Sequence, residues 1–215
     1  MCVIAVCEKR NLTDSEMELC WEANDHGAGV AWIEGGTLRW QKGFMKEEDL
    51  KKFYPTIKHL LPHIVHFRIA SVGGTCKELT HPFIISPQSP IQQTGELKEE
   101  GLLFHNGTYS GWGDVLMALQ LHAGKTIKGE VSDSRVIAML VDRLGEGVLR
   151  QVGGRVAIIN SNGKISRHGN GWTERRGIWF SNEGWELRTE EEDEREAAMK
   201  DGSFYYKGQS YRRIR

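Results

Sequence analysis

The sequence predicts an α+β fold in which antiparallel sheets are covered by helices. Its strand-like apolar runs are mostly joined in pairs by short turns, which is typical of hairpins and so of antiparallel sheets. Its helix-like segments fall in pairs between these groups of strands. With 215 residues, of which 39% are hydrophobic, the chain can bury a sizeable core.

Strands and helices alternate from the N-terminus. Val3–Val6 is apolar throughout, as expected of a strand buried on both faces. A capping box that begins at Thr13 predicts a helix to Trp21. The runs 30–33 and 38–40 are expected to form a hairpin that lies next to the first strand.

Apolar residues at helical spacing predict a further helix over 47–61, which starts afresh at Pro55 and ends before Pro62. Residues 64–70 form the next expected strand. Residues 75–98 lack periodicity and carry three of the five prolines, so we expect a long surface connection there.

The second half of the chain follows the same alternation. Ser132 can cap a helix that begins at Asp133, and Asn162-Gly163 between two strand-like runs is a strong hairpin signal. We expect strands at 101–104, 155–160, 164–167 and 177–181, and helices at 114–121, 133–144 and 189–200. The last residues, 204–215, are basic and aromatic.

Composition argues against several classes of protein. A net charge of -1 is unlike that of a nucleic-acid binder with a broad basic face. No apolar run is long enough to span a membrane, and residues 1–11 lack the regions of a secretory signal. The cysteines fit no zinc pattern, and Pro62 separates His59 from His63, so no metal site is expected. We expect a cytoplasmic protein with no membrane or nucleic-acid partner.

The second residue, Cys2, could be a nucleophile. Aminopeptidases remove an initiator Met before a small residue, which would leave a thiol and a free α-amine on Cys2. An α-amine titrates at about 7.7–8.0, so it can take a proton from the thiol and return one to a leaving group. The plainer interpretation is that Cys2 only begins a buried strand.

Three later segments could complete a site around this thiol. Asn106-Gly107 can offer a side-chain amide and a backbone N–H to an oxyanion, and each such donor stabilises the transition state by about 3–4 kcal/mol. Arg68 can hold a carboxylate, and Asp133 can hold an ammonium group. Each segment alone could be a turn, a surface ion pair or a helix cap.

Together, and in this order, the segments resemble the class II glutamine amidotransferase domain, an N-terminal-nucleophile hydrolase. The resemblance rests on Cys2 after Met1, on His66–Gly73, on His105-Asn106-Gly107 and on Ser132-Asp133-Ser134. It covers about residues 2–185.

The resemblance implies a four-layer αββα sandwich of two antiparallel sheets and hydrolysis of the glutamine side-chain amide to glutamate and ammonia. It implies no metal and no organic cofactor. It assigns catalysis to Cys2, Asn106 and Gly107, and glutamine binding to Arg68, Ser71 and Asp133. The chain departs from many members at residues 22–24, where an Arg-Gly pair is usual, and at Ile69, where an aromatic residue is usual.

We expect one amidotransferase domain over 1–215, with 186–215 as a C-terminal extension. Since no second domain follows, a separate synthetase or transferase would accept the ammonia, and 204–215 is the candidate contact because it is rich in Tyr and Arg. The alternative is that this segment packs as a final strand on its own domain.

Two other functions fit the same residues. One is an N-terminal-cysteine amide hydrolase that acts on acyl amides or γ-glutamyl conjugates, with identical chemistry at Cys2. The other is a non-catalytic regulatory subunit with the same fold. Arg68 with Asp133 favours a free amino acid head group, and therefore glutamine.

Overall fold

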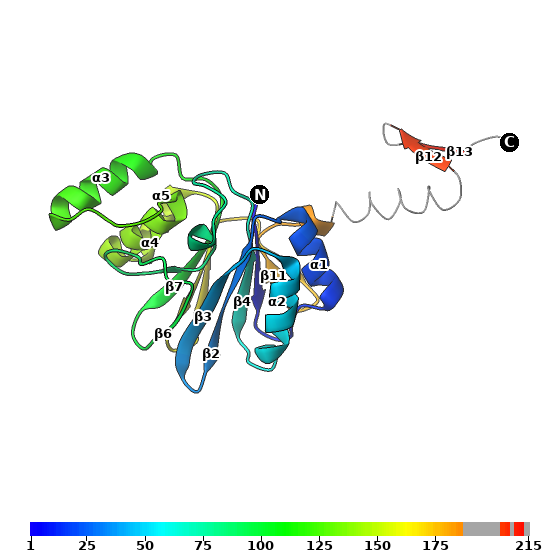
Figure 1. Cartoon of the computed structure of the whole chain (residues 1–215), viewed down its shortest axis with the longest axis horizontal. Helices are drawn as coiled ribbons and strands as arrows, with labels where there is room; N and C mark the ends of the chain where they lie inside the picture. Colours follow the sequence, from blue (N-terminus) through cyan, green and yellow to red (C-terminus); the bar gives the residue numbers. More distant parts are fainter. Residues whose placement is uncertain (187–202, 207–208, 213–215) are drawn as a thin grey trace.

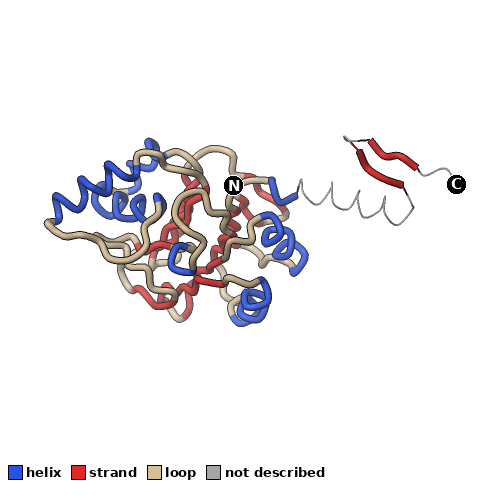
Figure 2. Tube along the Cα trace, turned by 45° about the horizontal axis from the view of Figure 1, so that its top comes forward, coloured by secondary structure: helices blue, strands red, loops and turns tan. Residues whose placement is uncertain are grey.

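The computed structural model describes residues 1–186, 203–206 and 209–212. Two sheets lie face to face in the middle, and helices cover the outer face of each, as Figures 1 and 2 show. This confirms the expected four-layer arrangement. The helix expected at 189–200 lies outside the described residues.

The larger sheet has seven strands in the order β10-β11-β1-β4-β2-β3-β6, and each neighbouring pair is antiparallel. Its strands are β1 (Val3–Cys7), β2 (Ala28–Glu34), β3 (Thr37–Phe44), β4 (His63–Phe67), β6 (Thr94–Leu97), β10 (Thr173–Arg175) and β11 (Ile178–Phe180). The β2–β3 hairpin is confirmed, but its expected place beside β1 was wrong. β4 is buried along its whole length, and it takes the central position between β1 and β2.

The smaller sheet has four antiparallel strands in the order β5-β7-β8-β9. They are β5 (Phe83–Ile84), β7 (Gly101–Asn106), β8 (Arg155–Asn160) and β9 (Ile165–His168). The predicted hairpin at Asn162-Gly163 joins β8 to β9, and Gly163 has the positive φ of 80° that such a turn requires.

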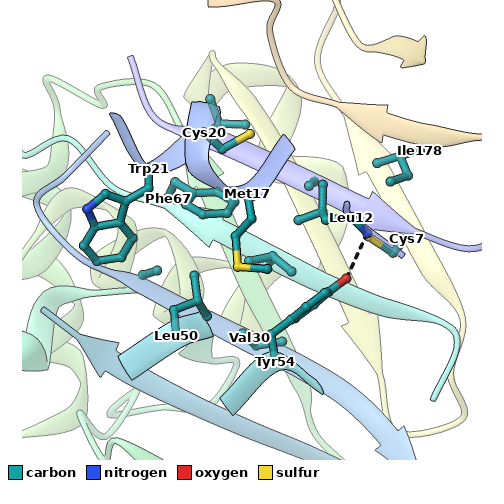
Figure 3. Close-up of a cluster of buried hydrophobic side chains, with 14 of the residues drawn as sticks. Cys7, Leu12, Met17, Cys20, Trp21, Val30, Leu50, Tyr54, Phe67 and Ile178 are labelled. Carbon is teal, nitrogen blue, oxygen red and sulfur yellow. Dashed lines mark hydrogen bonds between the residues drawn. The ribbon is translucent and has the colours of Figure 1, made fainter. Parts of the chain in front are cut away.

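Alternation along the strands explains the layers. In β1, Val3 and Ala5 join the core under the helices α1 (Asp14–Ala23) and α2 (Glu47–Phe53). Figure 3 shows this cluster, in which the Leu12 N–H donates to the Tyr54 hydroxyl at 3.0 Å. Ile4 and Val6 point the other way, into the core between the two sheets. Burying each such apolar side chain contributes about 1.5–3 kcal/mol.

The outer face of the smaller sheet is covered by α4 (Asp133–Leu144) and α5 (Leu149–Val152), and α3 (Trp112–Ala123) packs against α4. The predicted caps are confirmed. Thr13 and Glu16 form the capping box of α1, and the Ser132 hydroxyl accepts from Arg135 N at the start of α4.

Two expectations for the middle of the chain were wrong. The helix expected over 47–61 stops at Phe53 and continues only as the short turn η1 (Tyr54–Thr56), because Pro55 has no N–H to extend it. Residues 75–98 are no plain surface connection. They contain the turn η2 (Lys77–Leu79) and the strands β5 and β6, and Phe83 is fully buried.

Near the C-terminus, β12 (Ser203–Tyr206) and β13 (Gln209–Arg212) pair with each other as an antiparallel two-stranded sheet. Within the described residues, neither strand joins the seven-stranded or the four-stranded sheet. The segment therefore forms a hairpin, whereas the alternative interpretation expected a single final strand. No helix in the described part of the chain is long and apolar enough to cross a membrane.

Candidate active site

A small cavity of about 20 Å³ lies beside Cys2. The register of the larger sheet explains its position. Val3 pairs with Phe67, so the residue before β1 and the residue after β4, Cys2 and Arg68, come to the same end of the sheet. Five predicted site residues line this cavity: Cys2, Arg68, Ser71, Gly107 and Asp133.

The Cys2 thiol is partly buried and lies against the main chain of Ile69. Its sulfur accepts a hydrogen bond from Ile69 N at 3.3 Å and lies 3.3 Å from Ile69 O. Burial raises the pKa of the thiol, while the Ile69 N–H and the charge of Arg68 oppose the rise. The thiol is therefore a poor nucleophile at neutral pH unless a base takes its proton.

Met1, by contrast, extends into solvent. It is 73% exposed, so an aminopeptidase could reach the bond between Met1 and Cys2. The main chain of Cys2 is held from the other side, because Asn182 Nδ2 donates to the Cys2 carbonyl at 2.6 Å.

The two charged groups of the cavity are already bound by the main chain. The Arg68 guanidinium donates to the carbonyls of Gly74, at 3.0 Å, and Val72, at 3.4 Å. Asp133, the first residue of α4, accepts from Tyr109 N at 2.9 Å and from Ser134 N at 2.8 Å. These bonds fix a cation and an anion on the walls of one cavity.

Asn106 does not line the cavity. Its side chain is fully buried, and its Nδ2 donates to Ser181 Oγ at 2.9 Å. Its Oδ1 has no partner among the described residues. Gly107 itself has no room for a side chain, because a Cβ there would lie 2.8 Å from His105 Nε2.

Sequence reasoning assigned no role to Ser181 and Asn182. Ser181 Oγ accepts from Ile4 N and from Asn106 Nδ2, both at 2.9 Å, and so ties β1 to the predicted oxyanion amide. The sequence feature that could have pointed to them is the strand expected at 177–181, which ends at Ser181 and is followed by Asn182. Their contacts, however, depend on the β1–β11 register, in which Ala5 pairs with Phe180.

A group of buried histidines in and next to the cavity wall was also missed. The rings of His66 and His81 lie 3.9 Å apart, and His66 Nε2 donates to the carbonyl of His105 at 3.2 Å. His81 and His105 line the cavity. Burial lowers the pKa of His66 to about 3 and holds that of His81 well below its ordinary range, so these rings stay neutral.

Lys42 is buried as well. Its Nζ donates to the Pro82 carbonyl at 3.1 Å, and burial lowers the pKa of Lys42 to about 7. In the described part of the chain, no three His, Cys, Asp or Glu side chains are grouped to hold a metal ion.

The chain matches no family model and no curated protein. Among solved structures it is similar to glutamine phosphoribosylpyrophosphate amidotransferase from B. subtilis complexed with ADP and GMP, with a TM-score of 0.56 and 15% identity. It is also similar to the allosteric regulatory enzyme of purine biosynthesis, with a TM-score of 0.52 and 16% identity. Both likenesses cover 84% of this chain but only 41% of the other. They confirm the N-terminal-nucleophile hydrolase fold.

Proposed function

We propose that the chain is a glutamine-hydrolysing amidotransferase that uses Cys2 as its N-terminal nucleophile. The observation that carries the proposal is that Cys2, Arg68, Gly107 and Asp133 line one cavity at the end of β1. The residues come from four separate segments of the chain. The proposal is also supported by the fold that the chain shares with the glutamine phosphoribosylpyrophosphate amidotransferase from B. subtilis.

The reaction begins once Met1 is removed. The free α-amine of Cys2 takes the thiol proton, and the sulfur attacks the side-chain amide carbon of glutamine. When the carbon–nitrogen bond breaks, the α-ammonium returns its proton to the leaving nitrogen, which departs as ammonia. Water then hydrolyses the γ-glutamyl thioester to glutamate, and the thiol is restored. The raised pKa of the thiol is what makes the neighbouring amine necessary.

The head group of glutamine would be held by charge. Arg68 would bind the α-carboxylate and Asp133 the α-ammonium, with Ser71 in the wall between them. A cavity of about 20 Å³ holds little more than one water molecule, so glutamine requires the 71–74 segment to move outward. Arg68 would then exchange the carbonyls of Val72 and Gly74 for the substrate carboxylate.

The oxyanion would be stabilised by Gly107 N–H and by Asn106. The Asn106 Nδ2 group carries two hydrogens, and Ser181 accepts only one of them. Ser181 and Asn182 are positioning residues in this proposal, because one holds the Asn106 amide and the other holds the main chain of Cys2.

Measuring ammonia release from glutamine, beside amine release from γ-glutamyl amides, tests the proposed substrate. We expect turnover of glutamine by protein that lacks Met1 and none by Cys2→Ala. Faster release of amines than of ammonia would instead make the chain a γ-glutamyl amide hydrolase, for which the same head-group contacts would serve. Absence of turnover with both would favour a regulatory subunit. The ammonia acceptor, expected to be a separate synthetase or transferase that contacts 204–215, stays a prediction.

A further inference from the structure

A second cavity, of about 590 Å³, lies where β8 begins and β9 ends, and we call it the β8–β9 cavity. Small-molecule sites in proteins typically measure about 300–1,000 Å³, so it is large enough for a ligand of metabolite size. Its lining residues are Leu149, Arg150, Gly153, Gly154, Arg155, His168, Gly169 and Asn170. Among the described residues, no Asp or Glu lines this cavity.

The two segments that form the cavity are in direct contact with each other. A Cβ at Gly169 would lie 2.0 Å from the Gly154 carbonyl oxygen, so the main chains meet where a side chain would not fit. Both glycines have a positive φ, of 84° and 74°. Arg155 Nε donates to the Asn170 carbonyl at 2.9 Å, which holds the arginine against the facing segment. The cavity is thus shaped by close main-chain packing.

The positive charge along the cavity is not balanced by protein carboxylates. Neither Arg150 nor Arg155 makes an ion pair with a described residue, whereas other arginines each pair with a glutamate, namely Arg10, Arg39, Arg167 and Arg175. His168 differs, because its Nε2 donates to Glu146 at 2.8 Å. Two unbalanced arginines that line one cavity repel each other, and an anion bound between them would remove the repulsion.

We propose that the β8–β9 cavity binds a small phosphate monoester. A guanidinium group presents a planar fork of donors that fits phosphate oxygens. A phosphate monoester carries a charge of about −1.5 to −2 at pH 7, which matches Arg150 and Arg155, whereas a monocarboxylate would leave one of them unbalanced. The side-chain amide of Asn170 can bond hydroxyl groups on the rest of the ligand.

The β8–β9 cavity adjoins the candidate active site at one wall. Gly107 lines the Cys2 cavity and Gly154 lines the β8–β9 cavity, and a Cβ at Gly154 would lie 3.1 Å from Gly107 Cα. Arg155 pairs with Asn106 in the β7–β8 register. A phosphate held by Arg155 would therefore lie beside the strand end that carries the predicted oxyanion donors. Binding does not require Cys2 to react, so this proposal can fail or succeed separately from the proposed function.

NMR titration of the full, ¹⁵N-labelled chain with glycerol 3-phosphate, glycerate and glycerol tests the proposal. The three probes share a hydroxylated three-carbon body and differ in charge. We expect glycerol 3-phosphate, added to millimolar concentration, to shift the amide signals of Gly153, Gly154 and Gly169. It should bind at least about tenfold more tightly than glycerate, because charged hydrogen bonds are lost with the smaller anion, and glycerol should not bind.

Arg150→Gln and Arg155→Gln should each weaken the binding of glycerol 3-phosphate at least about tenfold. Arg150→Gln is the cleaner of the two, since the Arg155 side chain also holds the Asn170 carbonyl. Arg176→Gln is the matched control, because it removes the same charge from an exposed residue between β10 and β11, and it should leave binding unchanged. Circular dichroism establishes that each variant is folded.

Three results would overturn the proposal. The first is the absence of shifts with glycerol 3-phosphate, or shifts that gather around Arg68 in the Cys2 cavity. The second is equal affinity for glycerate, which would show that the doubly charged group is not recognised. The third is an equal loss of binding in Arg176→Gln and Arg150→Gln, which would show that the anion responds only to the overall charge of the chain.

Discussion

One hydroxyl group, that of Ser181, holds two parts of the candidate site in place. It accepts from Ile4 N and from Asn106 Nδ2, so it fixes the predicted oxyanion donor relative to the strand that carries Cys2. Removing the hydroxyl leaves the Asn106 amide without its anchor. The position of Asn106 should then matter more for the transition state than for binding the head group of glutamine.

We predict that Asn106→Ala lowers kcat by roughly 10²–10³ with little change in KM. Ser181→Ala should lower kcat less, and Ser181→Thr, which keeps the hydroxyl, should recover most of the rate. Steady-state ammonia release measures both constants. An Asn106→Ala enzyme with wild-type kcat would remove Asn106 from the oxyanion site, and equal effects of the two Ser181 variants would remove the role of the hydroxyl.

The neutral histidines lead to a second prediction, which concerns the stability of the fold at acidic pH. Burial holds the pKa of His81 well below its ordinary value of 6.5, and neither ring nitrogen has a partner among the described residues. Below pH 6.5 the unfolded chain therefore binds a proton that the folded chain does not, so the free energy of unfolding falls as the pH falls.

We expect His81→Phe to reduce this loss, since phenylalanine keeps the ring contacts with His66 and cannot be protonated. Urea unfolding at pH 7 and pH 5 should show a loss that is smaller by about 1–2 kcal/mol in the variant. The same decrease in both proteins would show that His81 does not cause it.

The chemistry of single residues made part of this site predictable. Cys2, Arg68 and Asp133 follow from what a thiol, a guanidinium and a carboxylate can do in that order of segments. Ser181 and Asn182 could not be predicted, because their contacts with Ile4 and Cys2 depend on which strand pairs with β1.

At the scale of elements, the segment before β5 approaches the middle of the larger sheet closely. A Cβ at Gly29 in β2 would lie 1.8 Å from the carbonyl oxygen of His81, where no real side chain fits. The missing side chain at Gly29 thus lets the His81 segment pass over β2 and reach the cavity.

We predict that Gly29→Ala lowers the free energy of unfolding by about 2–4 kcal/mol, because the main chain of His81 must move. Gly147→Ala is the matched control, since a Cβ there meets nothing within 4 Å and should change stability by less than about 0.5 kcal/mol. Denaturant unfolding compares the two variants, and equal midpoints would contradict the close approach.

Locally encoded elements were predicted well, and the others were not. The Thr13 capping box, the Ser132 cap and the Asn162-Gly163 turn each depend on neighbours within a few residues. β5 has only two residues and β6 only four, which is too short for periodicity to show. The place of β4 between β1 and β2 is a pairing between distant segments, and nothing local signals it.

At the scale of the whole molecule, the two sheets bring distant ends of elements to one place. Cys2 precedes β1, Arg68 follows β4, Gly107 follows β7, and Asp133 begins α4. The fold itself thus assembles the cavity, and the function depends on whether Cys2 reacts there as a free N-terminal residue.

The most direct test is mass spectrometry of the purified protein after treatment with a glutamine analogue that carries an electrophile in place of the side-chain amide. The account predicts a chain without Met1 that gains one analogue, mapped to Cys2, and that glutamine protects from labelling. Cys2→Ala should gain none, although Cys7, Cys20 and Cys76 remain. Full glutamine hydrolysis by a chain that retains Met1, or labelling that persists in Cys2→Ala, would contradict the account.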